Sequence, residues 1–424
     1  MKILLVQSYL GGGEPPVFPL GLACIRPGLG KHEARGFDPN VHENPFEELK
    51  RVIRDFRPDA VGVSLRNIDS TNKRRVVFYY EFFKKMLGEI RSVTDAKIIA
   101  GGSGFSMFAG VIMEDEPRID YGVYLEGEFI IADLLDNLGA PEKVKGVYYR
   151  KDGKVRFTGP SEPADLKRLP PPDRDLNPVA AYKDVPEAVG IETKRGCALK
   201  CVYCIYGFLN GRRYRFRAPE KIVDEIETLG AKYGIDSFTF VDSVFNIPLK
   251  HAEAICREIL RRGIKPRWSA WFSESGLTRE FVELCGEAGC RKVILSPDGF
   301  SDAVLKALGK NITRDDIEKA YAVLKETGGF EVCYNFFKNP PGQTLSSFLS
   351  MAGFCLKARA GMGRRVHFEF NSMRIEPHTK LYEIALKEGM VEKGDDLLYP
   401  RYYTNPGTAY IERFMNLAMR LKGK

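Results

Sequence analysis

The chain has 424 residues, of which 44% are hydrophobic, and its formal net charge is +8 at pH 7. This length is enough for two or three domains with sizeable cores. The positive charge is spread along the chain, which excludes a basic or acidic tail as its source. No signal peptide, long apolar run or lipidation signal is visible, so the sequence predicts a soluble, cytoplasmic protein.

The first part of the chain alternates between strand and helix patterns. Helix patterns near 44–56, 76–90 and 129–138 separate apolar strand patterns at 1–7, 58–64, 97–100 and 119–125. This alternation predicts a doubly wound α/β domain over residues 1–145.

Ligands of such a domain bind beyond the carboxyl ends of its strands. Small residues in that position let a bulky ligand approach the backbone, although tight turns call for the same glycines. The sequence therefore predicts ligand contacts from three strand-end segments, which are Ser64, Leu65, Arg66 and Asn67, then Gly101, Gly102, Ser103 and Gly104, then Glu126, Gly127 and Glu128.

Residues 146–186 read as a connection between two domains. The Asp152-Gly153 pair between two short strand patterns predicts a β-hairpin. Three consecutive prolines at 170–172 predict a stiff, extended connector.

A second alternating region covers residues 187–380. Helices are expected to begin near Pro219, Pro248, Thr278, Ser301 and Thr344, between strands at 188–193, 237–241, 266–272, 291–296, 331–337 and 367–373. Six strand-helix units predict a partial (β/α)6 barrel of the TIM type that is open on one side. Residues 381–424 are left as a small C-terminal extension.

Three cysteines in one loop, Cys197, Cys201 and Cys204, have the spacing C-x3-C-x2-C. Three such thiolates can hold three irons of a cubane cluster and leave the fourth iron open to the amine and carboxylate of a substrate. The alternative is a structural zinc site, but zinc requires four ligands, and the next candidates are His251 and Cys256. The other six cysteines lie in apolar patterns and are expected to be buried thiols; they are Cys24, Cys256, Cys285, Cys290, Cys333 and Cys355.

This cysteine spacing, with the aromatic Tyr203 before the third cysteine, resembles the radical SAM superfamily. The preceding domain extends the resemblance to the cobalamin (B12)-dependent members. It does so through Pro19-Leu20-Gly21, Asp38, Val61–Ser64, Ala100–Gly102 and Leu125–Glu128. The resemblance implies a [4Fe-4S] cluster on Cys197, Cys201 and Cys204, S-adenosyl-L-methionine (SAM), and cobalamin on the three strand-end segments.

The cobalamin part departs from one known pattern. The D-x-H-x-x-G signature that supplies a cobalt-binding histidine is absent, and none of the five histidines lies in that context; they are His32, His42, His251, His367 and His378. The resemblance therefore implies cobalamin without histidine on cobalt, with Leu65, Arg66 and Asn67 facing its lower side.

The resemblance also implies that residues at the carboxyl ends of the barrel strands hold SAM. Two departures weaken the individual assignments: the fourth-strand acid is Asp298 within Ser-Pro-Asp-Gly, and Gln343 precedes Thr344 where a glutamate is common. The implied cofactor contacts are Tyr203, Asp242, Ser273, Ser296, Asp298, Asn335 and Arg374.

Arg212–Arg217 is the densest basic segment and is interleaved with aromatic residues. We interpret it as structural or close to the cofactor; a peptide or phosphate-bearing substrate, or RNA, are the alternatives. Trp268 and Trp271 are three residues apart on one predicted strand and should point to opposite faces.

By resemblance, the chain is a B12-dependent radical SAM C-methyltransferase. Such an enzyme methylates an unactivated sp3 carbon through a 5′-deoxyadenosyl radical and methylcobalamin, and a second SAM restores the methyl group. The implied partners are a reductant protein such as ferredoxin or flavodoxin and a peptide, protein or small-molecule substrate, with glutamine of methyl-coenzyme M reductase as a specific case; no membrane or nucleic acid is expected.

Three other functions stay open or are disfavoured. A cobalamin-dependent radical SAM cyclase or ring-rearranging enzyme, acting on a tetrapyrrole or small metabolite, is the alternative within the same chemistry. A B12- or redox-sensing binding protein is the alternative outside catalysis. A methylthiotransferase is disfavoured because residues 1–150 contain only Cys24, whereas that family carries three further cluster cysteines there.

Overall fold

The computed structural model describes residues 1–421, with side chains described up to Leu417. The chain divides into two compact units. Unit 1 contains Met1–Ser70 and Arg75–Gly190, and unit 2 contains Thr71–Arg74 and the chain from Ile191 onward. The division between the two units therefore falls at 190/191, compared with the predicted start of the barrel at 187.

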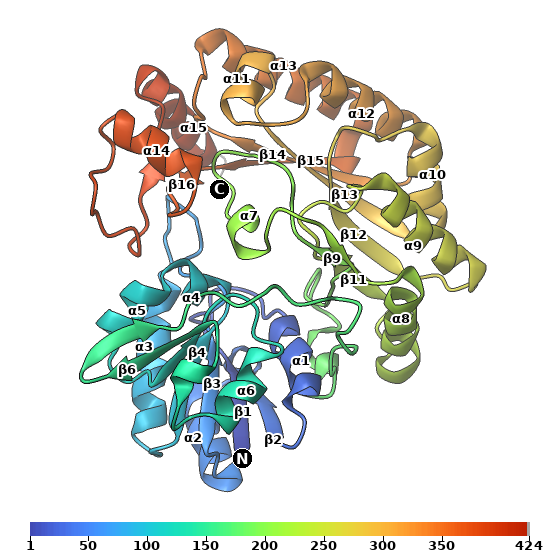
Figure 1. Ribbon diagram of the computed structural model, residues 1–424. Coiled ribbons are helices and arrows are strands. Elements are labelled where there is room, and N and C mark those ends of the chain that lie inside the picture. Colours follow the sequence, from blue (N-terminus) through green and yellow to red (C-terminus); the bar gives the residue numbers. More distant parts are fainter. Residues whose placement is uncertain (422–424) are drawn as a thin grey trace. The chain divides into compact units, whose positions relative to one another are not determined.

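Unit 1 is built on a seven-stranded sheet with the order β2-β1-β3-β4-β5-β6-β7 (Figure 1). The pairs among β1 to β5 are parallel, in an order typical of doubly wound α/β sheets. The strands are β1 (Lys2–Gln7), β2 (Glu33–Phe37), β3 (Ala60–Ser64), β4 (Lys97–Gly101), β5 (Tyr121–Val123), β6 (Val147–Lys151) and β7 (Lys154–Phe157).

Apolar stripes on the helices of unit 1 fix them against this sheet. In α2, Pro45 occupies the first turn, and Leu49, Ile53 and Phe56 are buried at helical spacing. Ile3, Leu5 and Ile99 from the sheet share one hydrophobic cluster with residues of α1 and α6. The helices are α1 (Leu20–Ile25), α2 (Pro45–Phe56), α3 (Tyr79–Arg91), α4 (Ser103–Met107), α5 (Ala109–Asp115) and α6 (Ile130–Asp136).

The β6–β7 hairpin is part of the sheet of unit 1. The sequence placed this hairpin in a connection, but β6 pairs with β5, with Val147 opposite Val123. The pairing covers the open edge of β5, whose backbone groups would otherwise lack partners. Residues up to 190 also return to unit 1, where Tyr182 donates a hydrogen bond of 2.5 Å to the buried carboxylate of Asp38.

Unit 2 contains a six-stranded sheet in the sequential order β8-β11-β12-β13-β14-β15. The strand pairs from β11 to β15 are parallel, and the end strands β8 and β15 are not neighbours in that order, so the sheet is open. All six strands fall within one or two residues of the expected ranges, except that the first is only two residues long. They are β8 (Gly190–Ile191), β11 (Ser237–Phe240), β12 (Arg267–Phe272), β13 (Cys290–Asp298), β14 (Glu331–Phe337) and β15 (Val366–Asn371).

Helices follow the strands of unit 2 and lie along the convex side of its sheet in Figure 1. The five expected helices are present, four of them capped or preceded by the residue at which they were expected to begin. One further helix, α12, follows α11 and is capped by Thr313. The helices are α8 (Pro219–Tyr233), α9 (Leu249–Arg261), α10 (Arg279–Glu287), α11 (Asp302–Ala307), α12 (Arg314–Thr327) and α13 (Leu345–Met362).

The C-terminal region is tied into unit 2. β16 (Met373–Arg374) precedes α14 (Lys380–Lys387) and pairs with β17 (Tyr402–Tyr403), which precedes α15 (Ala409–Leu421). Lys73, from the short segment that joins unit 2, donates hydrogen bonds of 2.7 Å to Thr404 and 2.9 Å to Glu412. Residues 422–424 of the predicted extension lie outside the described residues. No described helix combines the length and apolar character needed to cross a bilayer.

Candidate functional site

The three-cysteine loop of unit 2 starts after β9 (Lys194–Arg195) and leads into α7 (Tyr206–Leu209). Gly196 opens the loop with a φ of +97°, and a Cβ on it would lie 2.0 Å from the carbonyl oxygen of Arg213. Only glycine fits this close approach. The backbone N–H of Cys197 then donates to Gly211 over 3.0 Å, which fixes the first cysteine beside β10 (Arg215–Phe216).

Two distant parts of the chain hold the middle of the loop. The N–H of Val202 donates to Leu308 at the end of α11 over 2.9 Å, and its carbonyl accepts from Leu381 in α14 over 2.8 Å. Gly309 packs so closely that a Cβ there would lie 2.6 Å from the carbonyl oxygen of Lys200. The predicted C-terminal extension thus helps to shape the cysteine loop.

The chemistry of the three thiols fits a cluster. Cys197 is buried, and Cys201 and Cys204 are partly buried. Burial raises the pKa of Cys204 to about 12 and raises that of Cys201, so these thiols stay protonated unless a metal holds them as thiolates. Among the described residues, no three His, Cys, Asp or Glu side chains are arranged around a single ion, whereas the cysteines of a cubane each bind a separate iron.

A buried charged network lies next to the loop. Tyr203 donates its hydroxyl proton to Asp298, and Lys310 forms an ion pair with the same carboxylate. Lys310 also donates to the carbonyl of Ser296 over 2.5 Å and lies 5.6 Å from the Tyr203 ring centroid. Burial by itself would lower the pKa of Lys310, but the surrounding acidic groups, led by Asp298, together outweigh burial and raise the pKa, so the ammonium is retained. The sequence predicted Tyr203 and Asp298 but missed Lys310, which belongs to no motif.

Glu274 follows β12 and is a buried acid. Its side chain is 5% exposed, and Oε1 has no hydrogen-bond partner among the described residues. Burial raises the pKa of Glu274 to about 7, with the charge of Lys310 opposing the rise. Its place at a strand end was visible in the sequence, but its burial was not.

Three predicted SAM contacts lie on neighbouring strand ends. Asn335 donates through its side-chain nitrogen to the hydroxyl of Ser296 over 3.2 Å, and its Oδ1 atom is buried without a described hydrogen-bond partner. Ser273 is fixed by its backbone, because its N–H donates to Asn246 over 2.8 Å. Asn335 and Ser296 therefore offer polar atoms in the same part of unit 2 as Glu274 and Asp298.

Two other predicted contacts are already committed to holding the fold. The carboxylate of Asp242 accepts four hydrogen bonds, from the backbone and hydroxyl of Thr193 and from the backbone and ammonium of Lys194. Arg374 forms an ion pair with Glu376 and donates to the carbonyls of Leu397 and Leu398. Both side chains position the chain around the site.

The basic segment is mostly structural, as the sequence interpretation favoured. Arg212 donates to the carbonyl of Leu199 in the cysteine loop, and Arg217 donates to Glu192 and Glu225 over 2.6 Å each. Trp268 and Trp271 occupy opposite faces as predicted, since Trp268 is 2% exposed and Trp271 is 36% exposed.

In unit 1, the predicted strand-end segments meet at one edge of the sheet. The N–H of Leu65 donates to Gly101 over 2.8 Å, and the hydroxyl of Ser103 donates to the carbonyl of Arg66 over 2.7 Å. From the next strand, the N–H of Leu125 donates to Ser106 over 2.8 Å. The structure therefore brings together the three segments that the sequence singled out.

Several side chains of these segments are buried or held by other parts of the protein. The side chain of Leu65 is fully buried, whereas Arg66 and Asn67 reach the surface. Glu126 accepts from the N–H of Ala164 over 2.8 Å, and Glu128 is 5% exposed. Gly102 and Gly104 lie close to the backbone of the 64–67 segment, since a Cβ on them would lie 2.6 Å and 3.0 Å from the carbonyl oxygen of Leu65.

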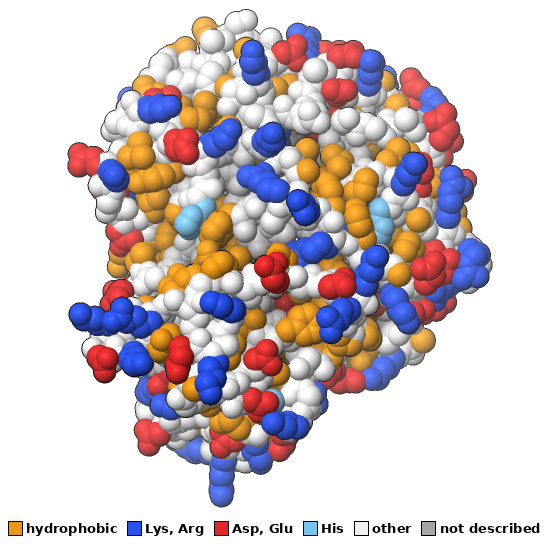
Figure 2. All heavy atoms as spheres, in the orientation of Figure 1, with side chains coloured by type: hydrophobic (Ala, Val, Ile, Leu, Met, Phe, Trp, Pro, Cys, Tyr) orange, Lys and Arg blue, Asp and Glu red, His pale blue; other side chains and the backbone are white. Residues whose placement is uncertain are grey.

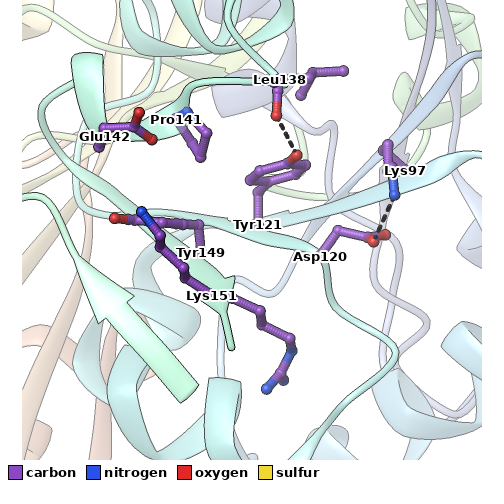
Figure 3. A pocket seen from close by; sticks show the side chains of 10 residues that line it. Lys97, Asp120, Tyr121, Leu138, Pro141, Glu142, Tyr149 and Lys151 are labelled. Atoms are coloured by element: carbon purple, nitrogen blue, oxygen red, sulfur yellow. Dashed lines mark hydrogen bonds and ion pairs between the residues drawn. The ribbon is translucent and has the colours of Figure 1, made fainter. Parts of the chain in front are cut away.

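A separate pocket of unit 1 lies at the opposite edge of the sheet, near the start of β4 (Figure 3). Some of its polar groups are paired: Lys97 contacts Asp120 at 3.3 Å, and the hydroxyl of Tyr121 donates to the carbonyl of Leu138 over 2.7 Å. Arg150 donates to the carbonyls of Ile119 and Glu116. Protein partners thus occupy part of the polar lining, which also includes Glu142, Tyr149 and Lys151.

Known proteins match both units of the chain. An uncharacterized methyltransferase of Pyrococcus horikoshii is 26% identical over 407 residues, which are 92% of this chain and 84% of the relative. A tryptophan 2-C-methyltransferase of Streptomyces laurentii is 28% identical and covers 67% of this chain and 58% of its own length. An anaerobic magnesium-protoporphyrin IX monomethyl ester cyclase of Rubrivivax gelatinosus is 25% identical, with coverages of 77% and 61%. The chain thus spans about three fifths of the last two relatives.

A solved structure has the same fold. The radical S-adenosylmethionine methyltransferase TsrM of Kitasatospora setae, with cobalamin and a [4Fe-4S] cluster bound, matches with a TM-score of 0.79 and 24% identity. The match covers 93% of this chain and 79% of that one. The model of the radical SAM superfamily matches residues 191–355, a segment that contains the three-cysteine loop and the strand ends around it. Over residues 191–355 the chain is therefore similar to enzymes of the radical SAM superfamily.

Proposed function

We propose that the chain is a cobalamin-dependent radical SAM methyltransferase acting on an unactivated carbon. The observation that carries the proposal is the loop that gathers Cys197, Cys201 and Cys204 beside a buried acid and ammonium at the carboxyl ends of the strands. Relatives named as methyltransferases match across both units, which supports the methyl transfer. When bound, the cofactors of such an enzyme supply a 5′-deoxyadenosyl radical and a methyl group.

In unit 2, we assign the three cysteines to the [4Fe-4S] cluster and the neighbouring strand ends to SAM. Ser296 and Asn335 offer a hydroxyl and an unpartnered amide oxygen, which suit polar groups of SAM. Tyr203, Asp298 and Lys310 keep a fixed, paired charge beside the loop. Ser273 contributes to the same rim, while Asp242 and Arg374 hold the surrounding backbone.

In unit 1, we assign cobalamin to the edge where residues 64–67, 101–104 and 126–128 meet. Arg66 and Asn67 are the surface side chains of the first segment, so they are the ones proposed to face the cofactor. No histidine lies in these three segments, and we expect cobalt without a histidine ligand. Their glycines leave room for a large planar ligand against the backbone.

The methyl acceptor is proposed as a residue of a protein or peptide. Glutamine of methyl-coenzyme M reductase is the specific case to assay, and free tryptophan, named for one relative, is the small-molecule comparison. Anaerobic incubation of the reconstituted protein with deuterated candidates and SAM, followed by mass spectrometry, identifies the acceptor.

The experiment that tests methyl transfer counts both nucleoside products of SAM against the methylated product. A methyltransferase of this type gives 5′-deoxyadenosine and S-adenosylhomocysteine at about one to one, because one SAM yields the radical and another restores the methyl group. Deoxyadenosine forming with product while S-adenosylhomocysteine stays at background would exclude methyl transfer and favour the ring-forming alternative. SAM left uncleaved under strong reductant would favour a binding protein.

A further inference from the structure

Five exposed cations surround the outside of the three-cysteine loop; we call them the loop patch. The patch consists of Lys200, Arg212, Arg213, Lys306 and Lys380. Their positions in sequence span 180 residues, so no local motif joins them. Only the fold of unit 2 brings them to one loop.

Backbone contacts of the loop place each of these residues. The carbonyl oxygen of Arg213 is where Gly196 approaches most closely, and Arg212 donates to the carbonyl of Leu199. Lys306 accepts through its carbonyl from Gly309, the glycine that packs on Lys200. Lys380 precedes Leu381, whose N–H donates to Val202. Every member therefore lies within one or two residues of a direct contact with the loop.

These cations lack acidic partners. In the part of the chain that the structure describes, none of the five forms an ion pair; by contrast, Arg262 contacts Asp224, Glu227 and Glu258. The nearest exposed acids on the same helices are Asp302 in α11 and Glu383 in α14, and Asp302 accepts from the N–H of Arg314 over 2.7 Å. Figure 2 shows Lys and Arg side chains gathered over the region where Figure 1 draws α7 and this loop.

We propose that the loop patch is the docking surface for an acidic one-electron donor protein of the flavodoxin or ferredoxin kind. The proposal rests on the proposed function only in requiring a cluster on Cys197, Cys201 and Cys204. The cluster gains one electron and the donor loses one, with no group transferred. A donor must bring its own cofactor close to the loop, and unpaired cations around the loop attract an acidic surface to that position.

The test measures how fast the cluster of the full-length, reconstituted enzyme is reduced. The variant reverses three patch charges outside the cysteine-containing segment: Arg213→Glu, Lys306→Glu and Lys380→Glu. The matched control reverses three exposed cations of α9 and the turn after it: Lys250→Glu, Arg257→Glu and Lys265→Glu. Rates per bound cluster are followed by the loss of cluster absorbance, with a reduced acidic flavodoxin as donor and with photoreduced deazaflavin as a small-molecule donor.

We expect the patch variant to be reduced by flavodoxin about tenfold more slowly than the control at low ionic strength, and the two rates to converge at high salt. Deazaflavin should reduce wild type, control and patch variant equally. A second variant, Arg213→Gln, Lys306→Gln and Lys380→Gln, should fall between the first variant and wild type, which separates charge from damage to the loop.

Two results would overturn the proposal. One is an equal flavodoxin rate in the patch variant and the control at low salt. The other is an unchanged flavodoxin rate together with lower product formation when deazaflavin supplies the electron, which would assign the patch to a phosphate-bearing or acidic substrate. The two reduction rates do not depend on methyl transfer, so failure of the proposed function would be recognised separately by its nucleoside products.

Discussion

Lys310 and Asp298 form a buried ion pair whose exposed side-chain fractions are 11% and 6%. Burying both charges is costly, and it is offset only when the partners satisfy each other. Here the carboxylate also accepts from Tyr203, and the ammonium also donates to Ser296. Asp298 has a φ of +62°, a conformation that residues other than glycine seldom adopt, so the surroundings hold it in place.

Removing one partner of this pair should be strongly destabilising. We expect Lys310→Met to cost about 3 kcal/mol of unfolding free energy, because it leaves the carboxylate of Asp298 buried without its cation. The double variant Lys310→Met with Asp298→Asn should recover much of that loss. Denaturation of the apoprotein measures the free energy of unfolding of both variants. The control is Lys325→Met, which replaces an exposed lysine of α12. A Lys310→Met protein as stable as this control would contradict the buried pair.

Glu274 gives a pH-dependent prediction. Its pKa rises from 4.5 to about 7 on folding, chiefly through burial. The folded state therefore holds the proton more tightly, and the resulting stability is present below pH 4.5 and is lost as the pH rises through about 7. Glutamine resembles the protonated carboxyl and does not titrate.

We expect the Glu274→Gln apoprotein to be as stable as wild type near pH 4.5, where the carboxyl of Glu274 is protonated. Above about pH 8 it should be more stable by up to ~3 kcal/mol, since one pKa unit is worth about 1.4 kcal/mol. Unfolding curves between about pH 5 and about pH 8.5 test this. The exposed Glu287→Gln at the end of α10 should show no such divergence, and a constant difference between Glu274→Gln and wild type would rule out the buried acid.

The loops after β3 and β4 shape the edge of the unit 1 sheet at the carboxyl ends of its strands. Gly102 has a φ of +100°, and a Cβ on it would lie 2.6 Å from the carbonyl oxygen of Leu65. Gly101 is different, because a Cβ there would meet its nearest atom at 3.7 Å, an ordinary contact. The shape of the 64–67 segment therefore depends on Gly102 and not on Gly101.

Gly102→Ala should weaken cobalamin binding by at least about tenfold, since backbone strain of this kind costs about 1–3 kcal/mol and displaces residues 64–67. Titration of the protein with cobalamin, followed by absorbance, measures the affinity, and iron content shows that the cluster is retained. Gly101→Ala is the matched control and should bind like wild type. Equal losses of affinity in both variants would mean that cobalamin occupies the space that either added methyl group fills. Unchanged affinity in both variants would place the cofactor elsewhere.

Among the helices and strands, the sequence predicted those that depend on local signals. Pro45 and the buried stripe of α2, or Thr278 and Thr344 as helix caps, are readable because capping and periodicity act within a few residues. The β6–β7 hairpin was recognised but assigned to a connection, because the turn is local whereas its pairing with β5 is not.

For the whole molecule, the sequence separation between contacting residues decides which features could be predicted. The cysteine loop could be recognised because its ligands lie within eight residues. Lys310 and the α14 contact to Val202 could not, because they reach the loop only through the fold of unit 2. Asp242 and Arg374 have the residue types expected of ligands, yet their partners Lys194 and Leu397 occupy them.

The two proposed cofactor sites belong to different compact units, so they should fail independently. Cys197→Ala, Cys201→Ala and Cys204→Ala should each abolish formation of 5′-deoxyadenosine, because each removes one cluster ligand. The cobalamin segments 64–67, 101–104 and 126–128 all lie in unit 1, whose sheet and core contain none of these cysteines. Cobalamin affinity in the three variants should therefore stay within about twofold of wild type. This is far less than a tenfold change, which corresponds to ~1.4 kcal/mol.

The control is Cys24→Ala, which replaces a buried thiol of α1 in unit 1 and should leave deoxyadenosine formation intact. Iron and sulfide analysis of the anaerobically reconstituted wild type should give about four of each per chain. A colourless, zinc-loaded and active protein would contradict the cluster assignment. A marked loss of cobalamin affinity in the loop variants would instead show that the cluster loop supports the cobalamin site energetically, and the two units would then have to be treated as a single cofactor-binding system.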